Sequence, residues 1–371
     1  MKKVLIIING FNVGGITVSL YSMLSSIDPT RVKIDIFARQ HSGDYLGKLP
    51  NCNILKENLW LSHSIYYRGY LLRILSGLLL GIRKFCEKLG VDMYHLYNHI
   101  GGKQIRSDSY DAVIGYDESL SHYVSLLPAR KRINMIHCDY RRYAKGIDES
   151  KFFDRIDTIV CVAESMRKVF CEYYPKYNSK TVAIHNIINV ESIREKAQEP
   201  INDNKFITDG FTLVSCGRLD PVKQFSRIPV IASKIKQLTC ANFRWYIIGD
   251  GADKESIEKA IVDNKMQEHI TLLGKKTNPY SYMSKANVYV CTSYSEAHPL
   301  VVNEARALCI PVVCNTFESA YESVLDGIDG FIIPLDDMHE KLADMIRHPL
   351  VIEKCYIEND VILNKIYSLF C

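Results

Sequence analysis

Short apolar runs rich in β-branched residues alternate with helix-compatible stretches along the whole chain, and this alternation limits the fold more than any other feature. In the first half the runs are residues 4–8, 32–37, 112–115, 133–136, 158–162 and 181–184. In the second half they are residues 211–215, 244–248, 269–273, 288–291, 311–313 and 330–333. Continuous apolar strands that alternate with helices are typical of parallel sheets covered on both faces. The sequence therefore predicts an α/β protein.

The two series of strands are separated by residues 189–209, a stretch rich in charge and asparagine. A chain of 371 residues suits two domains. We expect one doubly wound domain over residues 1–198 and a second over 199–352. A C-terminal helix within 353–371 could pack back on the first domain. Ligands of such domains bind at the carboxyl ends of the strands, so functional motifs should directly follow strands.

The composition excludes several classes of protein. Hydrophobic residues make up 47% and charged residues 24% of the chain, which argues against disorder, collagen and coiled coils. A net charge of +4 is too small for a general nucleic-acid binder, so no nucleic-acid partner is expected. The twelve cysteines form no C-x-x-C pair and lie mostly in apolar runs, which favours reduced thiols over disulfides or zinc. The first apolar run is too short for a signal peptide, and we expect a cytoplasmic protein.

Residues 65–89 do not fit the alternation, because a leucine-rich stretch is interrupted there by Arg68, Arg73, Arg83 and Lys84. This pattern has too much charge for a membrane-spanning helix. An amphipathic helix on an anionic membrane surface would have such a sequence. A helix packed on the sheet with a basic outer side would have it too. Both interpretations remain open at the level of sequence.

A glycine-rich loop with Gly10, Gly14 and Gly15 follows the first strand and precedes a helical stretch. Such a loop can bring backbone amides close to an anion, although this signal is weak by itself. The spacing is not G-x-G-x-x-G, and the loop 249–251 also fails that pattern because Lys254 follows it. No G-x-x-x-x-G-K-[ST] is present. A nicotinamide dehydrogenase and a P-loop ATPase therefore lose support.

Two cations follow the first strand of the second series, in the segment Gly217-Arg218-Leu219-Asp220-Pro221-Val222-Lys223. Arg218 could bind diphosphate oxygens in a bidentate manner, and Lys223 would add a mobile point charge. Taken alone, the two cations would be interpreted as solvated surface residues. Their place directly after a strand favours a ligand site.

Two carboxylates lie around a predicted helix start after the run 288–291. Glu296 is in the loop, Pro299 suits the first turn, and Glu304 is little more than one turn into the helix. The helix amides can meet a phosphate, and the carboxylates can accept hydrogen bonds from sugar hydroxyls. A carboxylate that merely stabilises the helix dipole would explain Glu296 but not Glu304.

The two segments together resemble the group 1 (family 4) glycosyltransferases. Glu296 to Glu304 matches their E-x7-E motif, and Gly217-Arg218-Leu219 with Lys223 matches their G-R-L-x-x-x-K element. The resemblance covers essentially the whole chain and implies the GT-B architecture, with two Rossmann-like domains facing a cleft. It further implies a sugar transfer with retention of configuration from a nucleotide-diphosphate donor, of which a UDP-sugar is the expected form. The acceptor would be a saccharide or a lipid-linked saccharide, and bacterial surface polysaccharide synthesis is the expected setting.

The resemblance also implies roles for individual residues. Arg218 and Lys223 would bind the diphosphate and stabilise its charge as it leaves, Glu304 would hold the ribose, and Glu296 would contact the donor sugar. His137, after the run 133–136, matches the histidine that such enzymes place near the transferred sugar; without the resemblance it would be interpreted as a structural histidine. The resemblance implies His137, Glu296, Arg218 and Lys223 as catalytic residues. It implies a nucleotide-sugar site made of Gly14, Gly15, Arg218, Lys223, Glu296, Ala297, His298, Pro299, Leu300 and Glu304.

Some details depart from the family or remain open. Ala297 and His298 stand where the family often has Gly and Phe, which leaves the donor sugar undetermined. Asp117 and Glu118 could serve the acceptor, but we expect a solvated loop pair. No D-x-D triplet occurs, and neither a metal nor another cofactor is expected. A nucleotide-sugar epimerase or hydrolase of the same fold, or a non-catalytic sugar-nucleotide-binding subunit, are the alternative functions.

Overall fold

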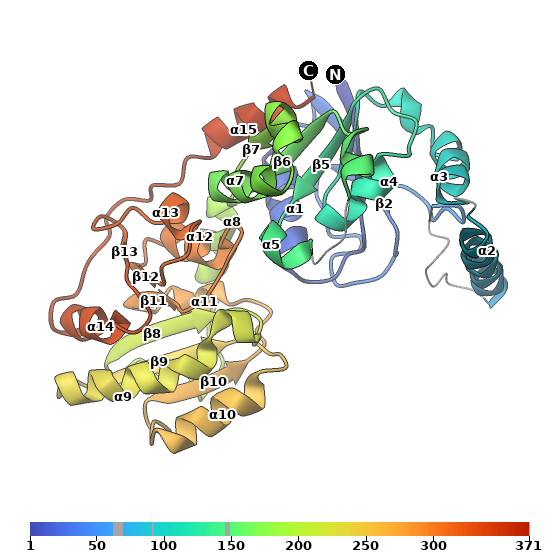
Figure 1. Cartoon of the computed structure of the whole chain (residues 1–371). Helices are drawn as coiled ribbons and strands as arrows, with labels where there is room; N and C mark the ends of the chain where they lie inside the picture. The colour runs from blue at the N-terminus through green and yellow to red at the C-terminus, as the bar shows by residue number, and fades with distance from the viewer. Residues whose placement is uncertain (62–69, 91–92, 145–148, 371) are drawn as a thin grey trace. The chain divides into compact units, whose positions relative to one another are not determined.

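The computed structural model describes residues 1–61, 70–90, 93–144 and 149–370 of the chain. It divides into two compact units, each built on its own parallel sheet (Figure 1). The N-terminal unit comprises Met1–Ile187 together with Asn359–Cys371, and the C-terminal unit comprises Ile188–Glu358.

The N-terminal unit holds a seven-stranded parallel sheet in the order β3-β2-β1-β4-β5-β6-β7. Its inner strand β1 pairs on both sides, with Ile6 opposite Ile36 of β2 and Ile114 of β4. The strands are β1 (Lys2–Ile8), β2 (Val32–Ala38), β3 (Cys52–Ile54), β4 (Ala112–Gly115), β5 (Arg132–Ile136), β6 (Thr158–Cys161) and β7 (Thr181–Ala183). The helices are α1 (Gly15–Ser26), α2 (Tyr70–Lys88), α3 (Met93–Gln104), α4 (Ser121–Val124), α5 (Tyr140–Tyr143), α6 (Ser150–Phe153), α7 (Glu164–Tyr173) and α15 (Asn359–Ser368).

The C-terminal unit holds a six-stranded parallel sheet in the order β10-β9-β8-β11-β12-β13. The strands are β8 (Phe211–Cys216), β9 (Phe243–Ile248), β10 (Ile270–Gly274), β11 (Val288–Cys291), β12 (Val312–Cys314) and β13 (Gly330–Ile332). The helices are α8 (Val190–Ala197), α9 (Ile228–Leu238), α10 (Lys254–Asp263), α11 (Tyr280–Met283), α12 (Leu300–Ala307), α13 (Ala320–Ser323) and α14 (Met338–Arg347). Two apolar clusters, one centred on Trp245 and one on Tyr289, form its core.

All twelve predicted strands are present, and the expectation of two Rossmann-like α/β domains is confirmed. The strands are recognisable in the sequence because the sheets are covered by helices, so that nearly every residue of β1, β4 and β11 is buried. Among the strands of the described residues, sequence reasoning missed the edge strand β3, which has three residues and no fully buried side chain.

The division between the units falls after Ile187, earlier in the chain than the expected boundary after residue 198. The reason lies in α8, which belongs to the C-terminal unit through packing of Ile193 against Ala307. The Arg194 Nε also donates a hydrogen bond to the Ala307 carbonyl at 2.9 Å.

Helix α15 packs on the N-terminal unit, beside the N-terminal end of the chain (Figure 1). Ile366 and Phe370 join the apolar cluster that surrounds β1. The Tyr367 hydroxyl accepts a hydrogen bond from the Asp28 backbone amide at 2.9 Å, and the Arg31 guanidinium lies 3.9 Å from the centre of the Tyr367 ring.

The basic amphipathic segment forms the nineteen-residue helix α2, while its first residues, 65–69, lie outside the described residues. Figure 1 shows α2 at the outer edge of the N-terminal unit, beside α3 and away from the sheet. The Tyr97 hydroxyl of α3 donates to the Leu79 carbonyl of α2 at 3.3 Å. In the described part of the chain, no helix is both long and apolar enough to cross a membrane.

Candidate functional site

In the C-terminal unit, the loops after β8 and β11 carry most of the residues singled out by the sequence. These strands are neighbours in the sheet and run parallel, with Leu213 opposite Val288. Their carboxyl ends therefore open at the same edge. The Tyr294 amide donates to the Val222 carbonyl at 2.8 Å, which joins the two loops directly. The structure thus brings the G-R-L-x-x-x-K and E-x7-E segments together.

Lys223 and Glu296 form a salt bridge between these loops, and their side chains are only 20% and 16% exposed. The Ser293 hydroxyl also donates to Glu296 Oε1, at 2.7 Å. Burial alone would lower the pKa of Lys223, but the Glu296 carboxylate outweighs burial and the pKa is raised. Lys223 therefore stays charged, and the pair is a preformed polar site at the end of the sheet.

Arg218 is placed differently from Lys223. Its side chain is 79% exposed, and its Nη2 lies 3.2 Å from Asp220 Oδ2. The Arg218 guanidinium is mostly in solvent, whereas Lys223 is largely covered by the protein. The two predicted cations are thus one exposed group and one held in a salt bridge.

The Gly249-Asp250-Gly251 segment supports the loop that carries Arg218. A Cβ on Gly249, whose φ is +149°, would lie 1.8 Å from the Gly217 carbonyl oxygen. The Leu219 amide donates to the Asp250 carbonyl at 3.0 Å. Gly249 and Gly251 allow their backbone to pack closely against that of Gly217 and Leu219. This packing explains the two glycines without a dinucleotide-binding motif.

Glu304 lies on α12 with only 6% of its surface exposed. Its Oε1 accepts a hydrogen bond from the Tyr280 hydroxyl of α11 at 3.0 Å. Burial raises the pKa of Glu304 to about 7, against the opposing effects of Tyr280 and of the Lys196 charge. This carboxyl therefore changes charge near neutral pH. Sequence reasoning missed Tyr280 because nothing in the spacing of the chain links it to Glu304.

The residues between the two glutamates form the entry to α12. Ala297 is buried, and Pro299 occupies the position before Leu300, the first residue of the helix. His298 is half-buried, with its Nε2 3.5 Å from the Asn303 side-chain nitrogen. The Ser319 hydroxyl donates to the Glu296 carbonyl at 2.7 Å and fixes the start of this turn.

In the N-terminal unit, His137 follows β5 at the carboxyl edge of the sheet. Its backbone amide donates to Glu118 Oε2 at 3.1 Å, and its ring centre lies 4.9 Å from that of Tyr116. Its Nε2 is buried and has no hydrogen-bond partner among the described residues. Burial lowers the pKa of His137 to about 4. His137 is therefore a neutral imidazole with one nitrogen available to a ligand.

Glu118 differs from the solvated loop residue that the sequence predicted. It is half-buried and bonded to the His137 backbone, and burial together with the nearby Asp117 raises its pKa. The solvated prediction was wrong because β4 and β5 are adjacent, so the loop after β4 lies against the loop after β5. Asp117 instead accepts a hydrogen bond from the Ser119 amide at 2.8 Å.

Gly14 and Gly15 lie at the start of α1, on the same sheet edge as His137. Gly14 has an extended backbone (φ 176°), and a Cβ there would meet no atom within 4 Å. The protein's own packing therefore does not require glycine at this position. The space over the helix start is open.

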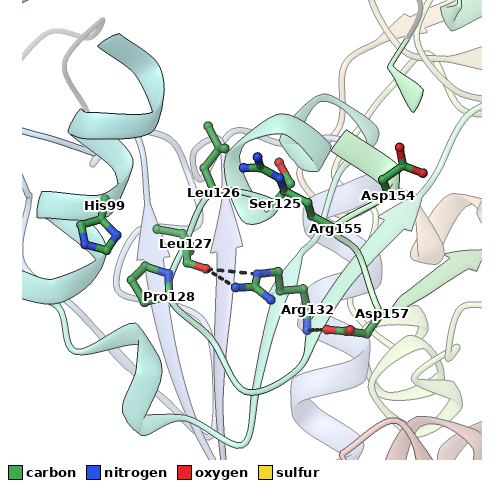
Figure 2. Close-up of a pocket in the computed structure, with 9 residues that line it drawn as sticks. All are labelled: His99, Ser125, Leu126, Leu127, Pro128, Arg132, Asp154, Arg155 and Asp157. Carbon is green, nitrogen blue, oxygen red and sulfur yellow. Dashed lines mark hydrogen bonds between the residues drawn. The ribbon is translucent and has the colours of Figure 1, made fainter. Parts of the chain in front are cut away.

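A pocket in the N-terminal unit lies away from these residues (Figure 2). It is lined by His99, Ser125, Leu126, Leu127, Pro128, Arg132, Asp154, Arg155 and Asp157. Arg132 is the first residue of β5, so the pocket is at the opposite end of that strand from His137. The Arg132 guanidinium donates to the Leu127 carbonyl at 3.0 and 3.1 Å, as the dashed lines in Figure 2 show. This arginine is thus engaged by the protein itself.

Neither unit offers an obvious metal site within the described ranges, where no three His, Cys, Asp or Glu side chains are grouped to hold an ion. The metal-independence expected from the sequence remains a prediction.

Comparison with known proteins relates the C-terminal unit to glycosyltransferases by sequence. Residues 196–355 match the family model described as "Glycosyl transferases group 1". A transferase of Campylobacter jejuni, named N-acetylgalactosamine-N,N'-diacetylbacillosaminyl-diphospho-undecaprenol 4-alpha-N-acetylgalactosaminyltransferase, is 30% identical over 172 residues, or 45% of each chain. The chain spans half or less of the length of the first curated relatives that it matches.

Solved structures agree over the whole chain at the level of fold. The structure of Staphylococcus aureus TarM in complex with Fondaparinux, alpha-GlcNAc-glycerol and UDP superposes with a TM-score of 0.70 at 14% identity, covering 100% of both chains. Anabaena HepE in complex with UDP has a TM-score of 0.64 at 14% identity, covering 100% of this chain and 93% of the other. The chain thus has the GT-B fold of two Rossmann-like domains, and its residues 196–355 are similar to the group 1 glycosyltransferases.

Proposed function

We propose that this protein is a glycosyltransferase that moves a sugar from a nucleotide-diphosphate donor to a saccharide or lipid-linked saccharide. The observation that carries the proposal is the buried Lys223–Glu296 pair on the neighbouring loops after β8 and β11, with Glu304 on the helix that follows. A fixed cation, a helix start and two carboxylates at one sheet edge suit a ligand that has both phosphates and hydroxyls.

In this proposal the diphosphate binds at Lys223, and the exposed Arg218 guanidinium closes on it. Arg218 is mostly exposed, and its ion pair is with the neighbouring Asp220, so it can turn to the phosphates at small cost. The two cations stabilise the negative charge that develops on the leaving diphosphate. No metal is needed for this step, and we propose that none is used.

Glu304 accepts hydrogen bonds from the ribose, and Glu296 orients the donor sugar while remaining in contact with Lys223. Ala297 and His298 lie beside Glu296 and are proposed to influence which sugar is accepted. In the N-terminal unit, His137, whose buried Nε2 has no protein partner in the described chain, is proposed to bind a sugar hydroxyl.

We further propose that the configuration of the sugar is retained, with the leaving phosphate assisting deprotonation of the acceptor. The donor is proposed to be a UDP-sugar of the hexose or N-acetylhexosamine type. HepE and TarM, which share the fold, were solved with UDP, and the C. jejuni relative is named as an N-acetylgalactosaminyltransferase. The reaction is placed at the cytoplasmic face of a membrane, in the synthesis of a surface polysaccharide.

The test is a turnover assay with a panel of UDP-sugars, with and without saccharide and lipid-linked acceptors, in the presence of EDTA. We expect acceptor-dependent release of UDP that is lost in Lys223→Ala and Glu296→Ala. Acceptor-independent epimerisation of the donor would replace the transferase by an epimerase. Binding of UDP without turnover on any acceptor would favour a non-catalytic binding subunit.

A further inference from the structure

Helix α2 presents an apolar stripe to solvent, which is unusual for a helix of a folded domain. The stripe consists of Leu71, Ile74, Leu75, Leu78, Ile82, Phe85 and Leu89, whose side chains are between 40% and 70% exposed. Most of them are spaced alternately by three and four residues, so they follow one side of the helix.

The side of α2 that is turned towards the protein carries both polar and apolar residues. Ser76 and Arg83 are buried there, at 6% and 8% exposure, and Leu79 and Leu80 are half-buried. Arg83 forms an i,i+4 salt bridge with Glu87 at 3.3 Å. Packing within the described chain therefore accounts for Leu79 and Leu80 but not for the exposed apolar stripe.

The charges of α2 distinguish between the possible occupants of the stripe. Arg73, Arg83, Lys84 and Lys88 are basic and Glu87 is the one acidic residue, which gives the helix a net charge of +3. Lys84 and Lys88 are exposed and one turn apart, and Lys88 follows Phe85 by three residues, which places it beside the stripe. A second copy of the chain would bring like charges together, whereas an anionic lipid surface would attract them.

We propose that α2 binds an anionic lipid bilayer, lying in the plane of the surface with the apolar stripe inserted among the acyl chains. A helix with leucines and a phenylalanine on one side and lysines on the flank has the form of an interfacial helix. The apolar side chains supply the depth of insertion, and the cations contact the lipid phosphates. Helix α2 contains none of the residues assigned to the nucleotide-sugar, so lipid binding can be tested without transferase activity.

The experiment is flotation of the full-length protein with phosphatidylcholine vesicles that contain about 30 mol% of the anionic lipid phosphatidylglycerol. We expect the wild type to float with these vesicles, to bind pure phosphatidylcholine at least about tenfold more weakly, and to lose binding as salt is raised. No donor sugar is needed, so the result is independent of the transferase assay.

Two variants test the apolar side chains. Leu78→Asp and Phe85→Asp should each lower the partition coefficient at least about tenfold, because burial of one such side chain contributes about 1.5–3 kcal/mol. Leu238→Asp is the matched control, since Leu238 is a similarly exposed leucine (48%) on α9 of the other unit. All three proteins should keep the melting temperature of the wild type, because none of these side chains lies in a core.

A double Lys84→Gln/Lys88→Gln variant should lose at least about tenfold on the anionic vesicles and little on pure phosphatidylcholine, since each cation near the surface contributes about 1 kcal/mol. Absence of flotation by the wild type would overturn the proposal. Equal flotation of Leu78→Asp and wild type would also overturn it. A lipid-free dimer that becomes monomeric in Leu78→Asp and does not float would assign the stripe to a second copy instead.

Discussion

Replacing Glu304 by Gln should have opposite effects on stability and on nucleotide binding. Burial raises the pKa of this carboxyl from 4.5 to about 7 in the folded protein. In the unfolded chain it ionises near its ordinary value, so between about pH 4.5 and 7 the native state binds more protons than the unfolded state. The contribution of Glu304 to stability therefore falls as pH rises through this interval and stays constant above it.

The magnitude follows from the size of the shift. At about 1.4 kcal/mol per pKa unit, holding the buried carboxylate above pH 7 costs about 3 kcal/mol. Glutamine has no charge to bury and its carbonyl can still accept the hydrogen bond from Tyr280. Glu304→Gln should therefore be more stable than the wild type by up to about 3 kcal/mol at pH 8, and equally stable near pH 4.5.

Nucleotide binding should change in the other direction, because an ionised carboxylate is the stronger acceptor for ribose hydroxyls. With a pKa of about 7, Glu304 is about one tenth ionised at pH 6 and nine tenths at pH 8. If only the ionised form binds well, the apparent Kd for UDP falls about tenfold over this range. The terminal phosphate of UDP also titrates near pH 6, so the comparison is the ratio of wild type to Glu304→Gln at each pH.

The assays are urea unfolding at pH 5 and pH 8 and calorimetric titration with UDP at pH 6, 7 and 8. Glu268→Gln serves as the control, since it removes an exposed carboxylate from the same unit. The reasoning is refuted if Glu304→Gln is no more stable than the wild type at pH 8, or if the ratio of UDP affinities does not change with pH.

Two further predictions concern the backbone of the loops that follow β8 and β9. Gln224, directly after Lys223, has a left-handed backbone conformation (φ 52°) that is strained for a β-branched residue. In denaturant unfolding, Gln224→Val should lower the free energy of unfolding by about 1–2 kcal/mol, whereas Gln224→Gly should leave it almost unchanged. Equal losses in the two variants would contradict backbone strain at this position. Gly249→Ala places a Cβ 1.8 Å from the Gly217 carbonyl and should weaken UDP binding and stability together. Gly274→Ala is its control, because a Cβ at that left-handed glycine meets nothing within 4 Å, and similar losses in both variants would argue against the close contact.

The fold was largely predictable because each strand of a covered parallel sheet is an uninterrupted apolar run. Edge strand β3 escaped because it lacks fully buried residues. That Lys223 and Glu296 belong to one site was also predicted, since each follows a strand and the resemblance assigns both to the donor, but their salt bridge was not. The sequence alone did not predict that β8 and β11 are neighbours in the sheet.

The environment of the site residues was less accessible. The contact of Tyr280 with Glu304 joins two helices that no motif connects. Glu118 was misjudged because its burial depends on the adjacency of β4 and β5. For α2, periodicity revealed an apolar side and a basic side, but only the structure shows that the apolar side is the one that faces solvent.

The most direct test of the account is calorimetric titration of UDP into the full-length protein in the presence of EDTA, for wild type, Lys223→Ala and Arg218→Ala. The account predicts metal-independent binding by the wild type and at least about tenfold weaker binding by each variant, because each loses one charge contact to the diphosphate. Melting temperatures would verify that the variants are folded. Failure of the wild type to bind UDP, or unchanged affinity in Lys223→Ala, would contradict the assignment of this site to the diphosphate of a nucleotide-sugar.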